Sequence, residues 1–258
     1  MPWAEQLVEL VPLGSAVVAA AFATMLARQY LQRGRLYQII WTVSMALFAL
    51  GAFLEFLMSL ATVTGPLFDL YYVIIGPETG LLGAGVVFLL RPKVGRYVLY
   101  AVTVLSACLV VSVLIWPIDL SGLATSAPAP IISYQQWFKS SVIDGIYYSV
   151  SAFAAVPREF TMVLNFVGAI LVVGGGVLSY VVDRRRTYAL LIAAGALMNA
   201  VGGILLGILN YPDLFFYFEF LGIVLLFLGF FYSTRFIVKS SAAALSSSAA
   251  TPPSWAKT

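Results

Sequence analysis

The sequence contains no histidine and only one cysteine among its 258 residues. Histidine is the commonest metal ligand and general acid–base group, and it often ligates haem iron. With Cys108 alone, neither an intrachain disulfide nor a cysteine-based metal cluster can form. The spans also lack a Gly-rich phosphate loop, a GxSxG elbow and an HExxH motif. We therefore expect no cofactor and no enzymatic activity.

Charge is scarce as well. Charged residues make up 10% of the chain, whereas hydrophobic residues make up 62%. Soluble domains are nearer one-quarter charged and one-half apolar. The composition therefore predicts a polytopic membrane protein whose main partner is the lipid bilayer. The net charge of +3 is too small to indicate a nucleic-acid partner.

Long apolar runs recur along the chain, and each approaches the roughly 20 residues that a helix needs to cross the hydrocarbon core. Because backbone groups cannot be left unpaired in lipid, we expect an all-α fold, a polytopic transmembrane bundle of seven helices. The predicted spans cover residues 9–31, 38–62, 67–90, 96–117, 160–182, 187–209 and 213–238.

The basic residues predict the orientation of this bundle. Three follow each of the first, third, fifth and seventh spans, which places twelve of the fourteen on one side. The positive-inside rule then predicts an outer N-terminus and a cytoplasmic C-terminus in a multi-pass plasma-membrane protein. The twelve are Arg28, Arg33, Arg35, Arg91, Lys93, Arg96, Arg184, Arg185, Arg186, Arg235, Lys239 and Lys257.

Two segments lie outside the predicted spans. Residues 118–159 form a long outer loop within the domain of residues 1–239. Its aromatic stretch at 132–155 fits either an amphipathic helix resting at the membrane interface or a lid over an outer cavity. Residues 240–258 are rich in Ser and Ala, and their low complexity predicts a disordered cytoplasmic tail.

Several polar residues lie inside the spans, where a side chain must be hydrogen-bonded, paired or turned towards water. They follow stripes of small residues that let helices approach closely, so we expect them to face the bundle. Glu55 and Glu219 lie nearer the outer surface, where Lys139 or Arg158 of the outer loop, or water, would be available as partners. The candidate intramembrane polar site comprises Glu55, Pro77, Glu78, Asn165, Asn199 and Glu219.

Glu78 is placed near the bilayer midplane. Pro77 before it removes one backbone donor and frees the carbonyl of Val73. Because burial disfavours the charged form and no cation lies at this depth in the spans, Glu78 is predicted to be protonated and hydrogen-bonded to Val73 or Asn199. Two interpretations stay open: polar glue between helices, or a binding site or proton relay.

The first three spans resemble the last three. With Tyr37 placed on Tyr188, Gly51 falls on Gly202, and in the third spans Asp69 falls on Asp213. Gly85 then meets Gly229 and Arg91 meets Arg235 in that second register. The pattern is typical of a 3+1+3 arrangement of parallel repeats, in which the fourth span links two halves of the same orientation.

Three families share features with this chain. The layout of spans resembles that of the SWEET sugar transporters, although spans two, five and six lack the interior prolines that serve that family as hinges. Trp41 in span two, with Tyr72, Gly76 and Pro77 in span three, is similar to the seven-helix sensor regions that precede histidine kinases. The whole chain is also similar to uncharacterised prokaryotic seven-helix membrane proteins, through its QIIWT, LFALGAFLE and YY segments.

These observations favour a non-enzymatic integral membrane protein. The leading hypothesis is a sensor-like or receptor-like bundle, or an accessory subunit, that acts on a protein partner. The alternative is a small-solute or ion transporter that uses a midplane pocket of Glu78 and Asn199. A light-driven retinal protein is excluded, because the last span carries no lysine before Lys239 at its cytoplasmic edge.

Overall fold

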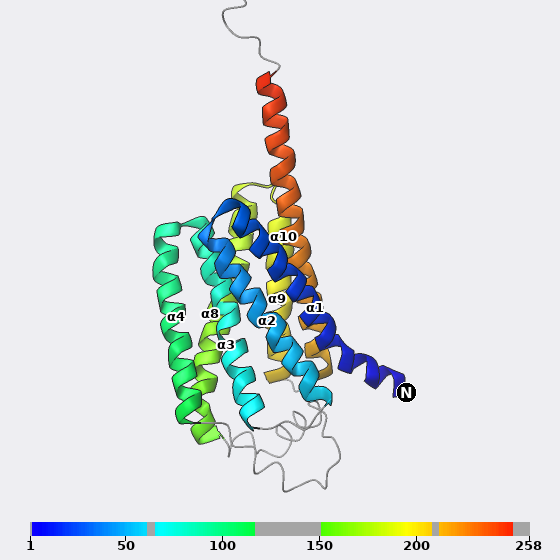
Figure 1. Cartoon of the computed structure of the whole chain (residues 1–258), viewed down its shortest axis with the longest axis vertical. Coiled ribbons are helices and arrows are strands. Elements are labelled where there is room, and N and C mark those ends of the chain that lie inside the picture. The colour runs from blue at the N-terminus through cyan, green and yellow to red at the C-terminus, as the bar shows by residue number, and fades with distance from the viewer. Residues whose placement is uncertain (1, 61–64, 117–150, 208–211, 250–258) are drawn as a thin grey trace, which may run out of the picture.

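The computed structural model describes residues 2–60, 65–116, 151–207 and 212–249, and these residues form helices joined by short turns (Figure 1). Seven helices are long and apolar enough to cross a membrane, which confirms the predicted seven-helix, all-α architecture. The helices are α1 (Pro2–Arg33), α2 (Leu36–Leu60), α3 (Gly65–Leu90), α4 (Pro92–Ile115), α8 (Ser151–Val182), α9 (Tyr188–Gly207) and α10 (Pro212–Ala249).

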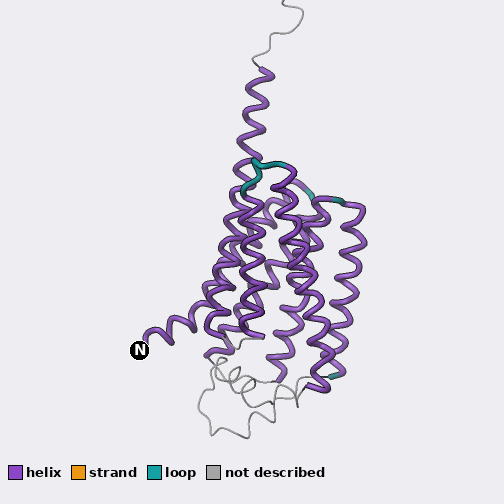
Figure 2. Tube along the Cα trace, turned by 180° about the vertical axis from the view of Figure 1, so that it is seen from behind, coloured by secondary structure: helices purple, strands orange, loops and turns teal. Residues whose placement is uncertain are grey.

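The described turns gather at one end of the bundle (Figure 2), which we call the basic end because Arg and Lys residues surround them. Gly34 ends α1 with a φ of 64°, a conformation that side chains disfavour, and its N–H donates to the Tyr30 carbonyl at 2.7 Å. Pro92 starts α4 at a position where its missing N–H costs nothing. Arg186 pairs with Asp183 at 3.2 Å between α8 and α9. These turns hold consecutive helices antiparallel.

Six of the helices form a closed ring. Contacts join α1 to α2, α2 to α3, α3 to α8, α8 to α9, α9 to α10, and α10 back to α1. Helix α4 stands outside this ring, where it packs against α3 and α8 and is the least buried of the seven spans. The ring therefore has an inner face, and side chains that point inward from α2 and α10 meet behind α1, the helix between them.

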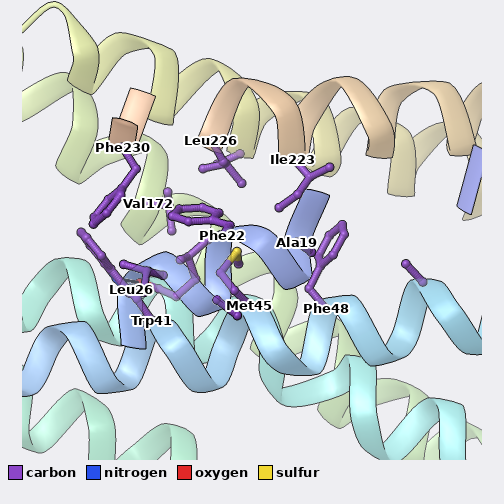
Figure 3. Packing of buried hydrophobic residues seen from close by; sticks show 14 of the residues in the cluster. Ala19, Phe22, Leu26, Trp41, Met45, Phe48, Val172, Ile223, Leu226 and Phe230 are labelled. Carbon is purple, nitrogen blue, oxygen red and sulfur yellow. Dashed lines mark hydrogen bonds between the residues drawn. The ribbon is translucent and has the colours of Figure 1, made fainter. Parts of the chain in front are cut away.

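Aromatic and aliphatic side chains fill the ring towards the basic end. Figure 3 shows Phe22 of α1, Trp41 of α2, Val172 of α8 and Phe230 of α10 converging on one cluster. The Phe22 and Phe230 rings lie 5.2 Å apart, and the Trp41 and Phe230 rings pack edge to face at 5.6 Å. Such contacts bury large apolar area and lock the side chains in one arrangement.

Glycines allow the closest helix approaches. A Cβ added to Gly83 of α3 would lie 2.8 Å from the carbonyl oxygen of Gly168 of α8. A Cβ added to Gly195 of α9 would lie 2.6 Å from the carbonyl oxygen of Gly222 in α10. The small-residue stripes thus pack as the sequence indicates, with one exception: Gly203, on the same predicted stripe as Asn199, faces open space.

The ends of two helices differ from the prediction. Helix α8 begins at Ser151, inside the segment 118–159 interpreted as a loop, and the stretch 117–150 lies outside the described residues. Helix α10 continues to Ala249, so residues 240–249 are helical rather than disordered. The reason is that this stretch is rich in alanine, the best helix former, and it extends a helix that is already nucleated.

Candidate functional site: a buried carboxyl pair

Two glutamates from opposite halves of the chain meet inside the ring. Glu55 of α2 and Glu219 of α10 have exposed fractions of only 3% and 7%. Their carboxyl groups lie within hydrogen-bonding reach of each other, and we refer to them as the carboxyl pair. One oxygen of each, Oε2, is buried and accepts no hydrogen bond within the described residues. The pair links two helices that are not neighbours in the ring.

Apolar layers enclose the carboxyl pair on both sides along the bundle axis. Towards the end opposite the basic end, Met58, Phe68 and Phe216 belong to one buried cluster. Towards the basic end, Phe48 and Ile223 belong to the aromatic cluster that fills the ring. A polar layer between two apolar ones has little water to satisfy it, so its hydrogen bonds must come from within.

Two further hydroxyl groups lie at the level of the pair. The Tyr71 hydroxyl of α3 donates to Oε1 of Glu55. Ser15 of α1 is fully buried, and its hydroxyl is unpaired within the described residues. Ser15 and Glu219 each lie five positions into their spans, which begin at Leu10 and Leu214. Since α1 stands between α2 and α10, Ser15 occupies the helix that covers the pair.

Glu78 lies deeper than the pair, twelve positions from either end of its span, Pro66–Leu90. Its carboxyl accepts a hydrogen bond from its neighbour Thr79 at 3.1 Å, rather than joining the Val73 carbonyl or Asn199 as predicted. Its backbone carbonyl accepts from the Ser44 hydroxyl of α2 at 2.7 Å. One turn further on, the Trp41 indole donates to the Leu82 carbonyl at 3.1 Å.

These two bonds fasten α2 to α3 beside Pro77, which is buried inside a continuous helix. A backbone carbonyl oxygen has two lone pairs, so it can accept a hydrogen bond from a neighbouring helix as well as from its own. The two bonds thus fix the position of α2 along α3. The side chain of Glu78 itself is only half-buried.

The two asparagines lie away from the glutamates. Asn199 of α9 packs against Gly222 of α10. Because Gly222 has only a hydrogen atom as its side chain, it leaves room for the asparagine side chain. Asn165 of α8 follows Leu164, which packs against Gly80 of α3. Both Oδ1 atoms are buried without a partner in the described part of the chain, and neither residue is hydrogen-bonded to a glutamate there. The predicted hydrogen bond between Glu78 and Asn199 is therefore not present in the described residues.

Tyr71 and Ser15 are absent from the set that the sequence indicates. A signal for Tyr71 exists, because Glu55 and Tyr71 lie at similar distances from the turn between α2 and α3, and such positions meet in an antiparallel helix pair. Ser15 gives no comparable signal, since its importance depends on α1 lying between α2 and α10. Chemically, the assembled group is a buried acid pair with one hydroxyl donor, which suits it to hold a proton.

Comparison with protein-family models, with curated proteins and with solved structures finds no match to this chain. By its helices, the chain is a seven-span, multi-pass membrane protein in contact with the lipid bilayer.

Proposed function

We propose that this chain is a non-enzymatic, sensor-like membrane protein that passes a signal from the membrane interior to a partner through α10. One observation carries the proposal: the helix that holds Glu219 inside the bundle is continuous with the helix that projects beyond it. The span of α10 ends at Ser233, and the helix continues to Ala249 as an isolated extension (Figure 1). An unbroken helix moves as a unit over this length.

The contacts of α10 fit this role. It packs tightly against α9 through Gly195 and Gly222, and it contacts α1. It meets α2 at two levels, at the carboxyl pair and, nearer the basic end, where Phe230 packs against Trp41. A change in the protonation or identity of the two glutamates therefore alters the contact of α10 with α2, while its contact with α9 persists. A helix held in this asymmetric way responds by tilting or rotating, and the extension amplifies the movement.

A double-label distance measurement tests the coupling. One spin label occupies the native Cys108, which is exposed on α4, and the other occupies an Ala244→Cys position in the extension. We expect Glu219→Leu to shift the distance distribution between the labels. The matched control is Leu221→Ala, two positions away on the lipid-exposed face, which should leave the distribution unchanged. An identical distribution in all three proteins would refute the proposal.

A proton-coupled transporter of a small solute or ion is the second candidate. It is favoured by the arrangement of three glutamates, which runs from the carboxyl pair to Glu78 near the middle of its span. The distinguishing measurement is proton flux into proteoliposomes that contain a pH-sensitive dye. A sensor shows no flux above empty vesicles, whereas flux that Glu78→Gln stops would establish transport instead.

We also propose that the basic end faces the cytoplasm of a cell whose plasma membrane holds the protein. All Lys and Arg side chains that the structure describes lie towards this end, and the α10 extension leaves the bundle there. Reporters fused after Lys239 should be active in the cytoplasm, and tags placed before Glu9 should be accessible from outside. A C-terminal reporter found outside would reverse the direction of the proposed signal.

An internal duplication is consistent with the ring. Exchanging α1–α3 with α8–α10 maps the order of contacts onto itself. Gly85 of α3 packs against Trp41 of α2, and Gly229 of α10 packs against Ile192 of α9, the positions that the two sequence registers superimpose. Neither register superimposes Glu55 on Glu219. On this proposal the two glutamates therefore do not descend from one residue of the duplicated unit.

A further inference from the structure

We propose that Glu55 and Glu219 together form a site for a single proton, held between their carboxyl groups. This deepens the proposed function by naming the ligand, and it rests on that function for its biological role.

The hydrogen-bond inventory of the pair calls for one more hydrogen. A carboxylate offers only acceptors, so two facing carboxylates cannot bond to each other. Tyr71 supplies one donor, to Oε1 of Glu55, yet Oε2 of each glutamate remains buried without a donor. A proton on one carboxyl turns the contact between the two groups into a strong, charge-assisted hydrogen bond. Two like charges in contact cannot both persist in so dry a place.

The donor set argues for a proton rather than a metal ion. Mg²⁺ and Ca²⁺ require about six or more oxygen ligands, and the pair offers two carboxylates with an aromatic hydroxyl that already points its hydrogen at one of them. Within the described residues no group of three or more acidic, His or Cys side chains is placed to hold a metal ion. The fully buried Ser15 hydroxyl adds one neutral donor or acceptor at the same level.

The polar groups around the pair come from the helices packed against it, α1 and α3, and from α2 and α10 themselves. Helix α3 contributes Tyr71 and, deeper in the bundle, Glu78. Helix α1 contributes the neutral Ser15, and α2 and α10 contribute the two glutamates themselves. The described Lys and Arg side chains lie towards the basic end, so none of them takes the place of the proton.

Loss of the proton would have a mechanical consequence. It leaves two carboxylates in contact between α2 and α10, and their repulsion pushes the two helices apart at the level of the pair, away from the Trp41–Phe230 contact nearer the basic end. Because α10 also carries the extension to Ala249, protonation of the pair and the position of the extension become linked equilibria. Protonation of the pair favours the closed arrangement of α2 and α10, and loss of the proton favours the open one.

Infrared difference spectroscopy of the purified full chain tests the site directly. At neutral pH, the shared proton should give one component of the protonated-carboxyl band. We expect this component to disappear completely in Glu55→Gln and equally in Glu219→Gln. The reason is that the remaining glutamate no longer shares a proton and instead accepts from the new amide. Glu159→Gln, which changes an exposed carboxyl at the start of the α8 span, serves as the control and should leave the band intact.

Two other results would overturn the inference. If each single variant removes a different half of the component, the glutamates are two independent neutral acids. If neither variant changes the band, both carboxyls are ionised and another cation must compensate them. Either result leaves the label-distance test unaffected, so failure of the proton site and failure of the proposed signalling function can be told apart.

Discussion

Replacing Glu219 by leucine alone should destabilise the bundle by about 1–3 kcal/mol, whereas replacing Glu55 and Glu219 together should recover most of that loss. The single variant leaves the Glu55 carboxyl, which is 3% exposed, without its partner in an apolar layer. Removing both partners deletes the desolvation cost of both groups, and buried ionic or polar pairs can often be replaced by apolar residues at little cost.

The measurement is a thermal unfolding series in detergent on the wild type, both single leucine variants and the double variant. Glu219→Gln is the matched control, because its amide can donate to Glu55 and should keep stability close to that of the wild type. The diagnostic quantity is the coupling energy between the two sites. Additive losses in the double variant would mean that the two glutamates do not act as a pair.

Gly195→Leu should lower the stability of the bundle by more than any exposed substitution in α9. A Cβ at this position would lie 2.6 Å from the Gly222 carbonyl oxygen and 2.7 Å from the Leu226 nitrogen, both in the backbone of α10. Backbone atoms cannot rotate away, so α9 and α10 must separate. Overpacking of this kind costs about 1–3 kcal/mol, and more where the surroundings are rigid.

Gly203→Leu on the same helix provides the comparison. Nothing lies within 4 Å of an added Cβ there, and leucine is a better helix former than glycine by roughly 1 kcal/mol. We expect Gly203→Leu to unfold at the same temperature as the wild type or at a higher one. Equal losses at Gly195 and Gly203 would show that the α9–α10 contact does not depend on the glycine.

The seven spans were predictable because each one is a local property of the chain. Twenty or so apolar residues must become a helix in lipid, and the predicted first residue of each span differs by only a few positions from the observed one. The boundaries that differ, at Ser151 and Ala249, lie where composition alone had to decide between helix and loop. At the end of α10, the alanine-rich composition and the preceding helix favour continuation of the helix to Ala249.

The candidate site was less predictable for a physical reason. Helical periodicity shows that Glu55 and Glu219 lie on small, inward-facing stripes, but it does not say which helices stand opposite each other. The pairing of α2 with α10 across α1 depends on closure of the ring, which joins residues from the two ends of the chain. The same ground applies to Glu78 and Asn199, since both residues lie near mid-span but have different neighbours, Thr79 for Glu78 and Gly222 for Asn199.

The order of the helices in the ring also bears on how the protein is made. Every described ring contact joins helices adjacent in the chain, except those of α3 with α8 and of α1 with α10. During synthesis α1, α2 and α3 can assemble as soon as they enter the membrane, but Glu55 has no acidic partner until α10 emerges. A chain truncated before α10 thus keeps an unmatched buried carboxyl, the kind of defect by which membrane quality control can distinguish an unfinished bundle from a finished one.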